Sequence, residues 1–157
     1  MLKKIKWILL GFVAILIIIG AYVVSLVRYA EIEQTALAGY TTSLSLMEDV
    51  VSVNQVHRFN GLESYIVASI EHESGQEVYF FVRDGRVQHY FFASDLIDEV
   101  QADIIAQDLL RNGEIINTQL GILAQTPIFE VQIKYEDAVY YIVIDAKTSE
   151  VILNFVL

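Results

Sequence analysis

Two kinds of hydrophobic pattern follow one another along the chain. Residues 7–27, WILLGFVAILIIIGAYVVSLV, contain no charged side chain. From Val50 onward apolar and polar positions alternate, which is typical of half-buried strands, and a helical spacing interrupts this alternation once, after Asp98. The pattern therefore predicts a long apolar helix followed by a domain of the α+β class.

The apolar run is long enough to cross a membrane. At about 1.5 Å per residue, a helix of this length spans a hydrocarbon core of roughly 30 Å. Lys3, Lys4 and Lys6 precede the run, and by the positive-inside rule they keep the N-terminus in the cytoplasm. We therefore expect a single-pass anchor in the cell membrane, residues 7–27, with the C-terminal part extracellular. The alternative is a cleaved signal peptide, because residues 36–38 have the small-x-small shape of a cleavage site.

Turn-forming residues divide the rest of the chain into eight predicted strands. Asn60-Gly61, Asp84-Gly85 and Glu136-Asp137 are typical hairpin turns. The predicted strands cover residues 50–59, 64–72, 77–82, 86–92, 114–123, 128–135, 138–144 and 150–157.

One helix is predicted between the fourth and fifth strands. Asp98 and Gln101 fit a capping box, Ser94 is an alternative, earlier start, and Asn112-Gly113 ends the helix. Four residues at helical spacing form its apolar face: Ala102, Ile105, Ala106 and Leu109.

The two halves of this domain repeat each other weakly, at an offset of about 60 residues. Each half reads as a helix with a small antiparallel sheet. A core of about 60 residues is marginal alone, so we expect the two lobes to pack together. The expected organisation is residues 1–28 for the cytoplasmic lysines and anchor, 29–93 for a juxtamembrane helix and first lobe, and 94–157 for the second lobe.

The segment YYIVIDAKTSEVI, residues 140–152, resembles a PepSY domain when it follows a helix and an alternating strand. The usual PepSY pattern has Gly where this chain has Ser149. Because Gly permits a positive φ there, Ser149 implies mild strain or a different turn.

The chain as a whole resembles the YpmB-like, or TseB, family of cell-wall elongation regulators from Gram-positive bacteria of low GC content. The lysine-flanked anchor carries the resemblance together with VNQVHRFNGLESYIVASIEHESGQEVYFFV and FEVQIKYEDAVYYIVIDAKTSEVILNF. The resemblance implies two PepSY/cystatin-like lobes, no enzymatic activity, and binding to a transpeptidase penicillin-binding protein of the elongation machinery. Other PepSY-like domains suggest an alternative, a peptidase inhibitor or folding assistant at the cell surface.

Composition narrows the possible partners. The chain has no Cys, which excludes disulfides, thiol catalysis and thiolate metal sites. From Arg28 onward it carries 20 acidic and 7 basic residues, a net charge of −13. We therefore expect no nucleic acid, anionic lipid or anionic wall polymer as a partner.

The sequence contains no nucleophile elbow, HExxH motif, phosphate-binding loop or dinucleotide fingerprint. We therefore expect no enzyme, no cofactor and no small-molecule substrate. His57, His72 and His89 lie on or near different predicted strands and are either unrelated or a pair of metal ligands.

The acidic residues offer few further candidates for a catalytic or metal-binding site. Those of the predicted helix, Asp98, Glu99, Asp103 and Asp108, form either a solvated face or, less simply, a pair of glycosidase carboxylates. Asp145 ends a strand, where its side chain is expected to close the turn, with Ca²⁺ binding as the alternative.

A protein-binding surface is a better candidate for the functional site than a catalytic or metal site. If Glu136-Asp137 is a two-residue turn, Lys134 pairs with Val139, Gln132 with Tyr141, and Glu130 with Val143. Three apolar side chains then lie on the sheet face away from the helix and need a cover, which is either the other lobe or a partner protein. The predicted partner-binding residues are Gln132, Lys134, Val139, Tyr141 and Val143.

Overall fold

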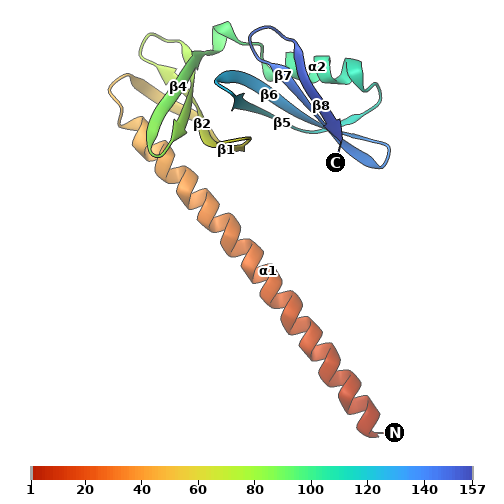
Figure 1. Cartoon of the computed structure of the whole chain (residues 1–157). Coiled ribbons are helices and arrows are strands. Elements are labelled where there is room, and N and C mark those ends of the chain that lie inside the picture. Colours follow the sequence, from red (N-terminus) through yellow and green to blue (C-terminus); the bar gives the residue numbers. More distant parts are fainter. Residues whose placement is uncertain (1, 157) are drawn as a thin grey trace. The chain divides into compact units, whose positions relative to one another are not determined.

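The computed structural model describes residues 2–156, and their side chains from Ile15 onward. The chain divides into two compact units, residues 1–39 and 40–157. The first is helical, whereas the second contains both sheets and a second helix (Figure 1).

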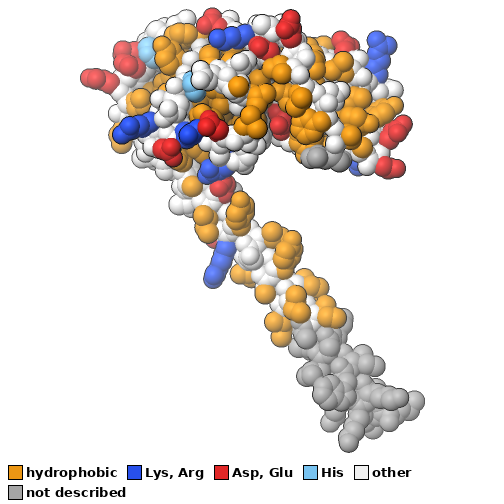
Figure 2. Space-filling view, viewed as in Figure 1, with side chains coloured by type: hydrophobic (Ala, Val, Ile, Leu, Met, Phe, Trp, Pro, Cys, Tyr) orange, Lys and Arg blue, Asp and Glu red, His pale blue; other side chains and the backbone are white. Residues whose placement is uncertain are grey.

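The helix α1 (Leu2–Ser45) is continuous, as predicted, through the apolar run and beyond Tyr29. From Ile15 it is long and apolar enough to cross a membrane, as an anchor or as a signal sequence. Its apolar side chains from Ile15 to Val27 are exposed, as expected of a surface that faces lipid (Figure 2).

Eight strands form two four-stranded antiparallel sheets, each in the order of the sequence (Figure 1). This confirms the predicted strands and the α+β class. The first sheet consists of β1 (Val50–Asn60), β2 (Ser64–His72), β3 (Glu77–Arg83) and β4 (Arg86–Phe92). The second consists of β5 (Glu114–Leu123), β6 (Thr126–Tyr135), β7 (Ala138–Asp145) and β8 (Val151–Val156).

The helix α2 (Glu99–Leu109) packs on β5 and β6. The predicted capping box is present: Gln101 N–H donates to Asp98 Oδ1 at 2.7 Å, and Asp98 N–H donates to Gln101 Oε1 at 3.2 Å. The suggested start near Ser94 is wrong, because Ala93–Asp95 is a separate 3-10 turn, η1, before the cap.

The predicted apolar face of α2 is correct except at its end. Ala102 and Ala106 are fully buried, and Ile105 packs against them. Leu109 is half exposed, however, because the helix ends there and Leu110 packs against the core instead. The helix next to the first sheet is the end of α1, where Leu44 is buried.

The two sheets share one hydrophobic core, so the lobes pack together as predicted. One buried cluster combines Phe59 and Phe81 of the first sheet with residues of β5, β6 and β7. At the junction His57 Nε2–H donates to the Leu120 carbonyl at 2.9 Å. A cation–π contact of 4.8 Å also links Lys147, after β7, to the ring of Phe91 on β4.

Candidate functional site

The register of the second sheet is the one predicted for the binding surface. Across the β6–β7 hairpin Lys134 lies opposite Val139, Gln132 opposite Tyr141, and Glu130 opposite Val143. Glu136 adopts a positive φ of 55°, as a tight two-residue turn requires. On the opposite face of this sheet Ile133, Ile142 and Ile144 are fully buried.

The structure separates Val143 from the other four predicted residues. Val143 is only 5% exposed and belongs to the core cluster that also contains Phe59 and Tyr65 of the first sheet. Val139 and Tyr141 are half-buried, and Lys134 is exposed. A partner-binding role for these residues stays a prediction, and Val143 contributes to the core.

The last strand adds two residues that sequence reasoning missed. The ring of Phe155 on β8 stacks on the ring of Tyr141, with 5.1 Å between centroids and an interplanar angle of 9°. Leu153 lies opposite Val143 on the same face and is 49% exposed. We call the surface formed by Gln132, Lys134, Val139, Tyr141, Leu153 and Phe155 the β7–β8 platform.

The strand β8 is exposed along its whole length, and α2 packs on β5 and β6 on the opposite sheet face. Figure 2 shows hydrophobic side chains gathered over β7 and β8, whereas acidic side chains lie mainly toward the periphery of the view. An edge strand without a charged residue is unusual, because exposed strand edges are normally protected by charges. Such a surface is typical of a protein-binding site.

The platform is apolar with one cation. Gln132 Nε2 donates to Glu130 Oε1 at 3.2 Å, and this bond fixes the amide at the border of the aromatic pair. Lys134 supplies the positive charge, close to the hairpin turn at Glu136 and Asp137. The arrangement is able to bind a protein surface, since it offers stacked aromatic rings for burial and a charged rim for orientation.

The turn between β7 and β8 is stabilised by hydrogen bonds to the side chain of Asp145. Asp145 Oδ1 accepts hydrogen bonds from the N–H groups of Lys147 (2.7 Å) and Thr148 (3.0 Å), which confirms its predicted role in closing the turn. Ser149 has a φ of 65°, so the strain predicted at this position is present. Ala146 is fully buried and hydrogen-bonds to Pro127 and Ile97 through its backbone.

The three histidines have different surroundings. Burial lowers the pKa of His57, against the opposing effects of its bond to the Leu120 carbonyl and of the Glu99 charge. His72 bonds Ser74, and the ring of His89 lies 6.2 Å from that of Tyr65. In the described part of the chain, no three His, Cys, Asp or Glu side chains form a group suited to a metal ion.

Two acidic residues at α2 form hydrogen bonds that stabilise the fold. Asp98 caps the helix, and Asp103 accepts a hydrogen bond from the Thr118 hydroxyl on β5. Asp108 is exposed on the solvent side.

The sequence also did not predict a polar cluster on the first sheet. Arg83 forms a 2.6 Å ion pair with Glu63, and the Tyr65 hydroxyl donates to the same carboxylate at 2.9 Å. The Arg83 guanidinium holds the pKa of Glu63 below its ordinary value. The cluster ties the start of β2 to the end of β3.

Comparison with known proteins supports the fold. The structure is similar to that of the YpmB protein from Bacillus subtilis, with a TM-score of 0.65 and 21% sequence identity, over 78% of this chain and 96% of that one. A protein described as a lipoprotein of Clostridium difficile 630 matches with a TM-score of 0.40 and 14% identity, over 69% of this chain and 82% of that one. No family model and no curated protein sequence matches the chain.

Proposed function

We propose that this chain is a membrane-anchored, non-enzymatic regulator of the YpmB-like, or TseB, family, which acts outside the cell. In this proposal it binds a transpeptidase penicillin-binding protein of the cell-wall elongation machinery. The observation that carries the proposal is the exposed apolar β7–β8 platform on a domain that follows a helix able to cross a membrane. The identity of the partner comes from the sequence resemblance alone, and the similarity to YpmB concerns the fold.

The proposed orientation follows from the charges. Lysines at positions 3, 4 and 6 favour a cytoplasmic N-terminus, whereas the segment from Arg28 onward is strongly acidic. A negatively charged domain is repelled by anionic lipids and wall polymers. It therefore stays available for a protein partner.

The proposed mechanism is positional. Two proteins anchored in one membrane meet at a much higher effective concentration than two free proteins, so a small platform is sufficient for binding. The platform contains a stacked aromatic pair, and aromatic residues contribute a large share of binding energy at protein interfaces.

The experiment compares three forms in cells that lack the protein: the intact chain, the domain on an unrelated transmembrane helix, and a secreted domain without an anchor. Incorporation of fluorescent D-amino acids measures cell-wall elongation, and circular dichroism verifies that the secreted domain is folded. We expect both anchored forms to restore elongation and the secreted form to fail. Full restoration by the secreted form contradicts the positional mechanism.

A further inference from the structure

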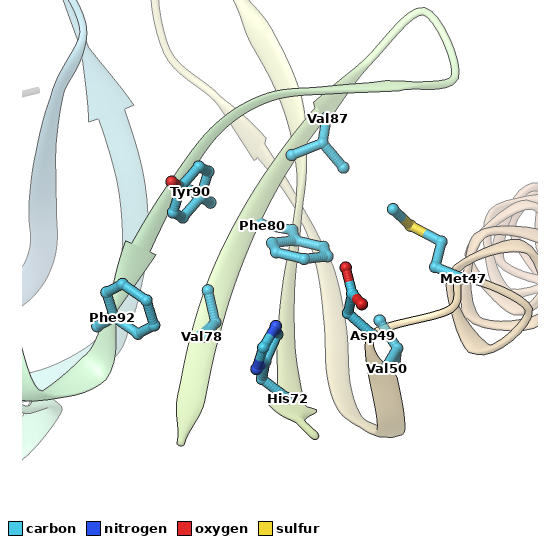
Figure 3. Close-up of a pocket in the computed structure, with 9 residues that line it drawn as sticks. All are labelled: Met47, Asp49, Val50, His72, Val78, Phe80, Val87, Tyr90 and Phe92. Carbon is cyan, nitrogen blue, oxygen red and sulfur yellow. The ribbon is translucent and has the colours of Figure 1, made fainter. Parts of the chain in front are cut away.

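A pocket of about 310 Å³ opens on the first sheet (Figure 3). Side chains on β3 alternate between two faces: Phe81 points into the shared core, whereas Val78 and Phe80 face the pocket. The loop that follows α1 closes one side, through Met47 and Asp49. The complete lining is Met47, Asp49, Val50, His72, Val78, Phe80, Val87, Tyr90 and Phe92.

Most of the pocket wall is apolar and aromatic. Phe80, Tyr90 and Phe92 surround one side of the opening in Figure 3, and Tyr90 and Phe92 touch edge to face with 6.2 Å between centroids. Tyr90 is 60% exposed, which is unusual for a large ring that has an apolar neighbour to pack against. The volume is at the lower end of the range for ligand sites, so the pocket accommodates a large side chain rather than a cofactor.

Two polar groups point into the pocket (Figure 3). The Asp49 carboxylate has no hydrogen-bond or ion-pair partner among the described residues, and its backbone carbonyl is held by the N–H of Glu73 at 3.0 Å. The backbone N–H of Ser74 donates to His72 Nδ1 at 3.1 Å, so Nδ1 is an acceptor and Nε2 carries the ring N–H. The pocket thus offers an anionic acceptor and an N–H donor, and none of the described Lys and Arg side chains lines it.

We propose that this pocket binds a short segment of a partner polypeptide, in which a Lys or Arg is adjacent to a large apolar residue. The apolar side chain enters between Phe80, Tyr90 and Phe92. The cation pairs with the Asp49 carboxylate and lies against the face of Tyr90. His72 Nε2–H donates to a backbone carbonyl of the bound segment.

The charge of the pocket and of the domain favours a basic peptide segment over the other ligands present at a membrane surface, such as lipid headgroups and wall polymers. The Asp49 carboxylate and the net charge of −13 from Arg28 onward repel anionic lipid headgroups and phosphate-bearing wall polymers. A basic segment is attracted by the same field. The inference concerns the first sheet and does not depend on the proposed binding of a penicillin-binding protein by the second.

The test uses the full chain in lipid nanodiscs and fluorescence anisotropy of a fluorescein-labelled peptide, Gly-Gly-Lys-Phe-Ser-Gly. Two matched peptides replace Lys by Glu or Phe by Ala, and empty nanodiscs measure binding to lipid. We expect saturable binding of the Lys-Phe peptide only to nanodiscs that contain the protein. Each matched peptide binds at least about tenfold more weakly, because it lacks one of the two contacts.

Three variants locate the binding. Asp49→Asn removes the charge with little change in shape and weakens binding by about tenfold. Tyr90→Ala removes an exposed ring and weakens binding by about threefold to fivefold. Asp108→Asn makes the same charge change on exposed α2 and leaves binding unchanged. Circular dichroism verifies the fold of each variant.

The proposal is overturned if the Lys-Phe peptide does not bind at millimolar concentration, or if all three peptides bind alike. Equal binding to empty nanodiscs overturns it as well, because the lipid is then the binding partner. If neither Asp49→Asn nor Tyr90→Ala alters binding, the peptide binds elsewhere on the protein, and the proposal is overturned.

Discussion

Gly121 on β5 lies against the ring of Phe59 on β1, at the junction of the two sheets. A Cβ atom added at Gly121 would lie 2.4 Å from Cε2 and Cζ of that ring, well inside contact distance. The other edge of the ring lies against a second glycine, since a Cβ added at Gly61 would be 2.7 Å from Cε1. Phe59 is only 3% exposed, so the junction accepts no side chain at residue 121.

The expected effect of Gly121→Ala follows from this geometry. Replacing Gly by Ala in a strand usually stabilises a protein by about 0.5–1 kcal/mol, because Gly loses more backbone entropy on folding. Here the new methyl group forces the Phe59 ring out of position, and overpacking of this kind costs about 1–3 kcal/mol. The clash prevails, and we expect a net loss of about 1–2 kcal/mol.

Urea unfolding of the chain from Tyr29 onward, followed by far-ultraviolet circular dichroism, measures this loss. With a urea dependence of about 1.5 kcal/mol per molar, the midpoint falls by about 1 M. Gly39→Ala is the control, because its new methyl group meets no atom within 4 Å apart from its own stretch of helix, and it should not destabilise the chain.

A double mutant tests the cause. Phe59→Ala alone costs about 3–5 kcal/mol, but in its background Gly121→Ala should cost nothing, because the ring that clashes is gone. The reasoning is refuted if Gly121→Ala leaves the midpoint unchanged, or if its cost is the same with and without the Phe59 ring.

Three further predictions concern the turn and the junction. Ser149→Gly should stabilise the domain by about 0.5–1 kcal/mol in the same urea assay, because glycine adopts a φ of 65° without strain; a lower midpoint contradicts this. Asp145→Ala should destabilise it by about 1–2 kcal/mol, since two turn N–H groups lose their acceptor, and an unchanged midpoint speaks against that role. Because burial lowers the folded-state pKa of His57, the unfolded chain binds a proton first as pH falls below 6.5. The wild type should therefore lose more stability from pH 7.5 to 5.5 than His57→Gln, which keeps an N–H donor for the Leu120 carbonyl; parallel losses would exclude His57 as the cause.

Most of the fold could be predicted from the sequence, because the fold is built from local hairpins. Alternating residues set the faces of each strand, and turn pairs such as Asp84-Gly85, both at positive φ, set the connections. The turn predicted at Asn60-Gly61 is formed instead by residues 61–63, because Asn60 ends β1 and pairs with Ser64. The register at Glu136-Asp137 was predictable because a two-residue turn fixes every pair of the hairpin. The Asp98 cap and the Asp145 turn were equally readable, because each depends on residues within three positions.

Features that depend on contacts between distant residues were not predictable. The burial of Val143 results from packing of the first sheet on the second, which no local pattern specifies. The strand β8 is apolar at odd and even positions alike, and a bulge at Ile152 changes its register, so Phe155 was not assignable to the platform. The pocket beside Asp49 combines residues from five segments, and its only sequence signal is the aromatic run of β3 and β4.

The most direct test of the central claim is photocrosslinking in living cells. A photoreactive amino acid replaces Tyr141 or Leu153 in the platform, or Ile104 on the exposed side of α2 as the control, and mass spectrometry identifies the trapped protein. Our account predicts that a transpeptidase penicillin-binding protein is captured from Tyr141 and Leu153 and not from Ile104. Capture of an exported protease instead, or crosslinks only within the chain, would contradict it.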